Sequence, residues 1–165
     1  MRLSLQKGAA AAGPNTVSHE LEDGTTLSWS LGEDAPEGAL LSAEVDLDAA
    51  TGWVMRLDRI DFVPGGVAYR HTHPGPGIRY LLFGEITIDS EGETTTYGPG
   101  EPWFERGPDP VLATTTEAEP TAFIRVLVLP EEWAGKRTIS YVDPADAEKP
   151  KTQKPTVFLE RPVAR

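Results

Sequence analysis

The sequence predicts an all-β domain, a sandwich or barrel built from many short strands. Its 165 residues include 16 glycines and 15 prolines, which divide the chain into short runs. Many of these runs are rich in Val, Ile, Thr and aromatic residues or alternate between polar and apolar residues, as strands do. No stretch shows the helical apolar period of an amphipathic helix. A chain of this length can bury a full core within one domain.

The strands are expected at intervals of roughly 8 to 12 residues. In order, the candidates are Thr25–Leu31, Leu40–Asp46, Trp53–Phe62, Val67–Thr72, Ile78–Phe83, Glu85–Asp89, Thr94–Tyr97, Pro102–Glu105, Val111–Thr115, Ala122–Leu129, Thr138–Val142 and Thr156–Leu159. The clearest hairpin is ITIDSEGETTTYG, in which Ile86 and Ile88 alternate with polar residues before a Ser-Glu-Gly turn. Residues 1–16 are expected to be flexible or swapped onto a neighbouring chain, residues 17–142 to form the barrel, and residues 143–165 to be a Pro-rich extension.

The composition excludes several classes of function. The absence of cysteine excludes disulfides, thiolate metal sites and a cysteine nucleophile. The net charge is −11, and residues 8–55 contain no Lys or Arg, so nucleic acid is not an expected partner. No apolar run approaches the ~20 residues of a membrane span, and the N-terminus does not resemble a secretory signal. A cytoplasmic protein is therefore expected.

The stretch YRHTHPGPGIRYLLFGEI, residues 69–86, carries the chemistry of the chain. Residues i and i+2 of a strand point to one face, so His71 and His73 offer two imidazoles to one ion. Tyr69 has the same parity, which makes its hydroxyl a candidate catalytic acid or hydrogen-bond donor. Nucleophile-elbow, phosphate-loop and His-Glu-x-x-His motifs are absent.

The spacing from Gly65 to Gly84 resembles the first motif of the cupins, Gly-x5-His-x-His-x3,4-Glu-x6-Gly. The segment GEPWFERGPDPVLATT, which starts at Gly100, stands where the second cupin motif is expected. The resemblance covers about residues 53–130 and implies a small cupin-like jelly-roll barrel. It also implies a homodimer, because cupins commonly pair their barrels through edge strands and terminal segments.

Two of the four cupin ligand positions lack a ligand here. Gly77 stands where the family has a glutamate, and Val111 where it has a histidine. A divalent ion such as iron, manganese, nickel or zinc would then need a third donor besides His71 and His73. Glu105 is the candidate, on one strand face with Trp103, which is expected to line the cavity.

Two further interpretations stay open. Alternation directs Arg79 inward, and Arg125 lies in an apolar strand, so both are candidate contacts for an anionic ligand or partners of buried carboxylates. Alternatively the metal site has been lost and the histidines are ordinary strand residues. His19 is expected at the surface, or as a third ligand if the N-terminal segment folds across the barrel mouth.

These observations favour a metal-dependent enzyme of oxygenase or isomerase type that acts on a small molecule, possibly an anion. The alternative is a non-catalytic small-molecule-binding or sensor barrel. Cupins support many activities, so the resemblance does not name a reaction.

Overall fold

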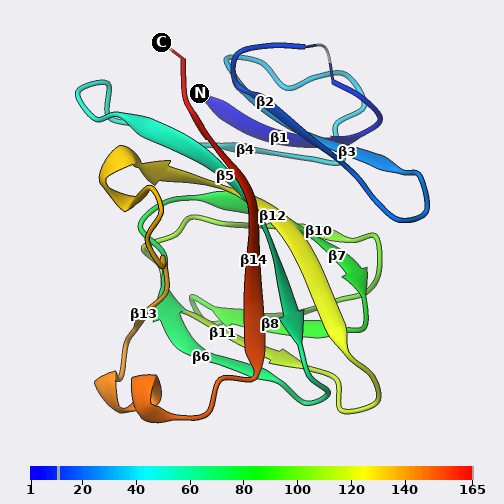
Figure 1. The fold of residues 1–165 in the computed structure, drawn as a ribbon, viewed down its shortest axis with the longest axis vertical. Helices are drawn as coiled ribbons and strands as arrows, with labels where there is room; N and C mark the ends of the chain where they lie inside the picture. Colours follow the sequence, from blue (N-terminus) through cyan, green and yellow to red (C-terminus); the bar gives the residue numbers. More distant parts are fainter. Residues whose placement is uncertain (11, 165) are drawn as a thin grey trace.

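The computed structural model describes residues 1–10 and 12–164, which form three antiparallel sheets (Figure 1). The first sheet has the order β2 (Thr16–Glu20), β3 (Thr26–Gly32), β1 (Arg2–Lys7), β4 (Leu41–Glu44). The second has the order β10 (Pro102–Glu105), β7 (Gly77–Phe83), β12 (Thr121–Pro130), β5 (Trp53–Phe62), β14 (Gln153–Pro162). The third has the order β13 (Ser140–Tyr141), β6 (Val67–Thr72), β11 (Val111–Thr115), β8 (Ile86–Ser90), β9 (Glu93–Tyr97).

The eight strands from β5 to β12 form a jelly roll. Numbered from one to eight along the chain, they pair in the order 6-3-8-1 in the second sheet and 2-7-4-5 in the third. This order is that of a double Greek key, the topology of jelly-roll barrels such as the cupins. The predicted all-β, cupin-like jelly roll is therefore confirmed. Two short 3₁₀ helices, η1 (Glu131–Trp133) and η2 (Pro144–Glu148), lie in the connections that follow β12.

The second sheet is a central layer with two differently packed faces. On β5, Met55 and Leu57 join the core shared with the first sheet, whereas Ile60 and Phe62 join the core inside the barrel. Strand β12 is buried from Thr121 to Leu129, as expected for a strand covered on both faces. The first core also contains Leu3, Leu5, Val17, Leu27, Trp29, Leu31, Val45, Ile78, Tyr80, Ile124, Val126 and Val128.

The two ends of the chain depart from the predicted organisation. The expectation of a flexible or swapped N-terminal segment is wrong for residues 2–7, which form β1 between β3 and β4 of the same chain. The reason is the alternation in RLSLQ, which buries Leu3 and Leu5 completely. At the other end, β14 is not an isolated extension, because nine of its ten residues pair with β5, which makes it an edge strand of the barrel.

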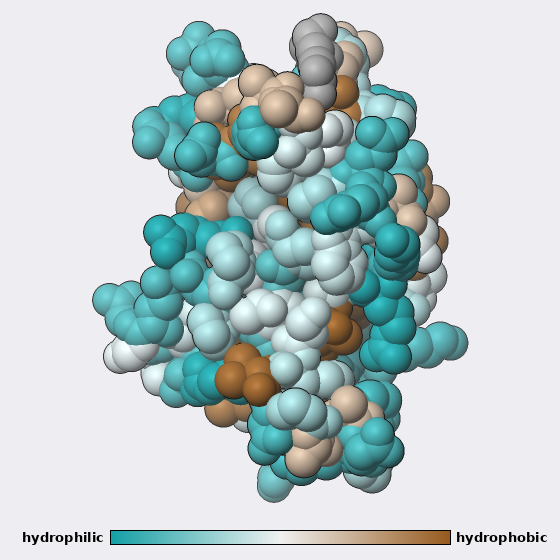
Figure 2. Space-filling view, turned by 90° about the vertical axis from the view of Figure 1, so that its left-hand side faces the viewer, coloured by the Kyte–Doolittle hydropathy of each residue, from teal (hydrophilic) through white to brown (hydrophobic). Residues whose placement is uncertain are grey.

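The outer surface is mostly hydrophilic on the face shown in Figure 2, where hydrophobic residues appear as isolated patches. Within the described residues, no helix combines the length and the apolar character that crossing a membrane requires.

The N-terminal sheet should contribute strongly to stability through β1. We expect Leu5→Ala to lower the free energy of unfolding by about 2–5 kcal/mol, because it leaves a cavity in the core between the first and second sheets. Leu40→Ala is the matched control, since Leu40 is 41% exposed and should cost far less. Urea unfolding of both variants checks this, and equal losses would mean that β1 is not part of the cooperative core.

Candidate functional site

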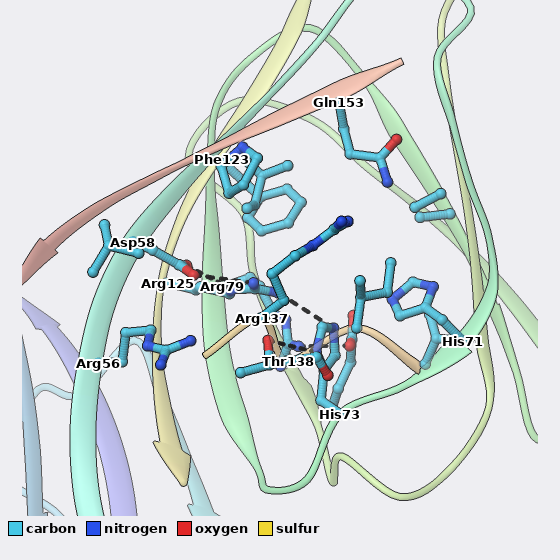
Figure 3. A pocket seen from close by; sticks show the side chains of 18 of the residues that line it. Arg56, Asp58, His71, His73, Arg79, Phe123, Arg125, Arg137, Thr138 and Gln153 are labelled. Atoms are coloured by element: carbon cyan, nitrogen blue, oxygen red, sulfur yellow. Dashed lines mark hydrogen bonds and ion pairs between the residues drawn. The ribbon is translucent and has the colours of Figure 1, made fainter. Parts of the chain in front are cut away.

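The barrel encloses a cavity of about 350 Å³ between the second and third sheets. Its walls are largely apolar. The apolar lining residues from the two sheets are Ile60, Phe62, Ala68, Ile88, Val111, Ala113 and Phe123. The mouth is bordered by the connection at residues 135–139 and by β14. Figure 3 shows His71, His73, Arg79, Arg125 and Arg137 around this space. A volume of this size is at the small end of the range for ligand pockets.

His71 and His73 both line the cavity, with ring centroids 4.9 Å apart. His71 Nδ1 lies 2.7 Å from the carbonyl oxygen of Tyr69, and His73 Nδ1 lies 3.2 Å from that of Thr138. Because a carbonyl oxygen only accepts, each Nδ1 carries the proton and each neutral ring has an acceptor at Nε2. Burial lowers the pKa of His71, and burial together with Arg125 holds the pKa of His73 well below its ordinary value. Both rings are therefore neutral at pH 7.

Arg79 lies at the floor of the cavity and is 0% exposed. Its Nη1 donates to the carbonyl oxygen of Gly77 at 2.8 Å, and its Nη2 lies 2.7 Å from Glu105 Oε2. Among residues 1–10 and 12–164, Nη2 and Nε have no hydrogen-bond partner, so the contact with Glu105 is an ion pair without a hydrogen bond. Burial lowers the pKa of Arg79 to about 10, against the opposing effect of Glu105, and the side chain remains a cation at pH 7.

Arg125 forms the second buried ion pair of the cavity. Its Nε and Nη2 donate to the two carboxylate oxygens of Asp58 at 2.7 and 3.1 Å. Its Nη1 lies 3.4 Å from Nε2 of His73, the acceptor nitrogen of that ring. His73 is thus held at both ring nitrogens, whereas Nε2 of His71 has no protein partner in the described part of the chain.

The charged residues of the cavity carry an excess of positive charge. Three ion pairs line it, Arg79 with Glu105, Arg125 with Asp58, and Arg56 with Glu160. The other charged lining residues are all cations, namely Lys136, Arg137 and Lys151. A chain with a net charge of −11 therefore has a cavity with an excess of three positive charges.

Tyr69 does not face the cavity, contrary to the alternation of the sequence. Val111 pairs with His71, but Ala113 pairs with Ala68, so β6 contains a bulge with one extra residue between these pairs. The bulge directs Ala68 and His71 inward together and turns Tyr69 away. Its ring instead lies under Lys149, whose Nζ is 4.1 Å from the ring centroid. The candidate catalytic role of Tyr69 is therefore not supported.

Trp103 and His19 also lie outside the cavity lining. Trp103 is buried against Phe123 and donates from Nε1 to Glu105 Oε1 at 2.9 Å, so it orients that carboxylate instead of contacting a ligand. His19 stacks on Phe158, with ring centroids 4.6 Å apart, beside a separate hollow. The N-terminal segment therefore does not bring His19 across the barrel mouth.

The position of Gly77, where the cupins have a glutamate, has no room for a side chain. A Cβ at this position would lie 2.6 Å from Leu127 Cδ2, 2.7 Å from the carbonyl oxygen of Val126 and 3.1 Å from Arg79 Nη1. A cupin glutamate therefore does not fit here, and the Arg79 guanidinium occupies space beside the glycine.

The donors present do not fit a divalent metal ion. Within residues 1–10 and 12–164, no three His, Cys, Asp or Glu side chains are grouped so that they could hold one. Glu105 lines the cavity, but Arg79 and Trp103 hold its carboxylate, and Arg125 faces Nε2 of His73. A divalent ion at this place would be repelled by the neighbouring guanidinium groups. At an effective dielectric constant of about 20, like unit charges about 4 Å apart repel by about 4 kcal/mol, and a dication doubles this cost. The expected third-ligand role of Glu105 is therefore not met.

Several lining residues were not predicted as site residues. Arg56 and Asp58 lie on the same face of β5 as Ile60 and Phe62. The signal for them was the presence of charged residues at alternate positions of the otherwise apolar strand WVMRLDRIDF, which indicates that one buried face is polar. Arg137 and Thr138 lie in a connection, where no periodic pattern indicates which side chains turn inward.

Breaking the Arg79–Glu105 pair should be costly. We expect Glu105→Gln to lower the free energy of unfolding by about 3–5 kcal/mol, because it leaves a buried guanidinium without a counter-charge. Glu44→Gln is the matched control, since the Glu44 side chain is 81% exposed and its pair with Arg2 should contribute at most about 1 kcal/mol. Chemical denaturation measures both, and comparable losses would show that Glu105 is not needed to neutralise Arg79.

The free energy of unfolding should decrease as the pH is lowered through the range where histidine titrates. The folded-state pKa values of His71 and His73 are lowered, so below about pH 6.5 the unfolded chain binds more protons than the folded chain. The free energy of unfolding should therefore decrease from pH 7 to pH 5.5, and less steeply in the variant with His71→Gln and His73→Gln. Denaturation curves at several pH values measure the two slopes, and equal slopes would contradict the neutral, buried state of these rings.

Neither a family model nor a curated protein matches the sequence. Among solved structures, the polyketide cyclase RemF from Streptomyces resistomycificus is 22% identical, with a TM-score of 0.44, over 58% of this chain and 64% of that chain. An RmlC-like cupin from Shewanella frigidimarina is 19% identical, with a TM-score of 0.41, over 54% and 86% of the two chains. KdgF from a Halomonas species is 14% identical, with a TM-score of 0.39, over 78% and 83%. The chain spans slightly less than two thirds of the length of RemF. The cupin-like jelly-roll fold is shown by the strand order of the chain itself.

Proposed function

We propose that the barrel binds a small organic molecule with a carboxylate or similar anionic group, and that His71 exchanges protons with it in an isomerase-type reaction. The observation that carries the proposal is the excess of three positive charges around the cavity of an acidic chain. Field lines from these cations are concentrated by the apolar walls, which favours an anion over a neutral molecule of the same shape. The protein is proposed to act in the cytoplasm, and as the homodimer that its resemblance to the cupins implies.

His71 supplies the acid–base part of the proposal. Its proton is held on Nδ1 by the carbonyl oxygen of Tyr69, which leaves a lone pair on Nε2. A lowered pKa keeps this ring neutral and thus able to accept a proton at pH 7. Nearby cations stabilise the negative charge that develops when a C–H bond beside a carboxyl or carbonyl group is broken. The proton can then be returned at another atom of the bound molecule.

Two alternatives remain. A metal-dependent oxygenase needs Glu105 to leave Arg79 and Arg125 to leave His73, so elemental analysis showing about one divalent ion per chain, bound through His71 and His73, would favour it. A non-catalytic barrel would bind anions with no turnover.

The test uses phenylpyruvate in D₂O, with NMR detection of exchange at the carbon beside its carbonyl group. We expect the wild-type protein to accelerate this exchange and His71→Gln to remove the acceleration while retaining binding, because Gln lacks the basic nitrogen. Equal acceleration by His71→Gln would exclude His71 as the proton acceptor. Tight binding without acceleration by the wild-type protein would favour the non-catalytic barrel.

A further inference from the structure

The connection that crosses the cavity mouth is pinned on both sides of Arg137. On one side, Arg56 donates from Nη2 to the carbonyl oxygen of Trp133 and from Nη1 to that of Lys136, each at 2.8 Å. On the other side, Thr138 is buried, and its carbonyl oxygen accepts from His73 Nδ1 at 3.2 Å. Because Arg56 and His73 are themselves buried, the backbone at residue 137 has little freedom to move away from the mouth.

The Arg137 side chain, in contrast, is exposed and lines the cavity. Figure 3 shows it extending from beside Thr138 into the middle of the pocket, between Phe123 and His71. No hydrogen bond or ion pair holds its guanidinium within residues 1–10 and 12–164, whereas each of the other three arginines of the cavity has a carboxylate partner. Arg137 is thus a cation with free donors on a fixed backbone.

The remaining cations of the mouth are less suited to hold a ligand. Lys151 Nζ already donates to the carbonyl oxygens of Ala147 and Asp146 and lies 4.5 Å from the ring centroid of Tyr141. Lys136 has a point charge on a flexible stem, whereas an arginine presents a planar pair of donors that matches a carboxylate.

We infer that Arg137 binds the anionic group of the ligand and sets the preference for a carboxylate, while the apolar body of the ligand lies against Phe62 and Phe123. This inference rests on the proposed function, and it names the residue that recognises the ligand and the class to which the ligand belongs: a carboxylate on a compact hydrocarbon or aromatic body. The carboxylate would displace only water from Arg137, since no ion pair has to be broken.

Matched acid and amide probes test the inference, namely benzoate with benzamide and hexanoate with hexanamide. We expect the wild-type protein to bind each acid at least about tenfold more tightly than its amide, because a charge-assisted bidentate hydrogen bond is lost in the amide. Arg137→Gln should abolish this preference and leave amide binding unchanged, and Arg137→Lys should restore part of it. Lys7→Gln removes the same charge from β1, in the N-terminal sheet, and should change neither affinity. Titration calorimetry gives the dissociation constants, and circular dichroism checks that each variant is folded.

The outcomes separate the inference from the proposed function. If the wild-type protein does not prefer acids to amides, or binds neither up to millimolar concentrations, the proposed anionic ligand is wrong. If it prefers acids and Arg137→Gln keeps the full preference, the proposed ligand class stands but Arg137 is not its receptor. A preference lost equally in Lys7→Gln would show a general effect of net charge and would also overturn the role of Arg137.

Discussion

The interior of this barrel depends on buried guanidinium groups, each held against a carboxylate. Arg125 with Asp58 and Arg79 with Glu105 bring four charges into a space walled by Phe, Ile, Val and Ala side chains. Removing such charges from water costs several kcal/mol per ion, which only close pairing offsets. Once present, they determine the rest of the site. Arg125 and Arg79 help keep His73 neutral, and Arg79 occupies the carboxylate of Glu105 that a metal would need. The positive excess at the mouth comes from Lys136, Arg137 and Lys151.

The same ion pairs show that the stretch from Gly65 to Gly84 resembles a cupin motif in its spacing but not in the chemistry of the side chains around it. The two histidines keep their positions on neighbouring inward sites of the barrel, but the space beside Gly77 is closed by Leu127, Val126 and Arg79. Gly77 therefore does not leave a vacant ligand position, because these neighbours fill the space beside it. A sequence motif fixes where backbone atoms lie, whereas the charge of the neighbouring side chains decides which ligand the position accepts.

Much of the barrel could be predicted from the sequence, because period-two alternation and turn residues act locally. Strands Trp53–Phe62, Val67–Thr72, Pro102–Glu105 and Val111–Thr115 have the predicted bounds, and Arg79 was expected to point inward. The β6 bulge was not predicted, since one extra residue leaves the composition of the strand unchanged while it reverses the side that Tyr69 faces. The pairing of Arg125 with Asp58 and the position of Arg137 in the cavity lining depend on contacts between distant segments, which no local pattern reveals.

Strand β5 connects the cavity to the N-terminal sheet, because its two faces line different parts of the molecule. Its residues alternate between the cavity, where Arg56 and Asp58 lie, and the core shared with the first sheet, where Met55 and Leu57 lie. None of residues 1–10 and 12–50 contributes a side chain to the cavity, yet the N-terminal sheet covers the apolar back of the sheet that carries it. A shortened chain that began at β5 would retain every group of the candidate site and expose that apolar face to water. The candidate site therefore depends for its support on a sheet that contributes none of the described lining residues.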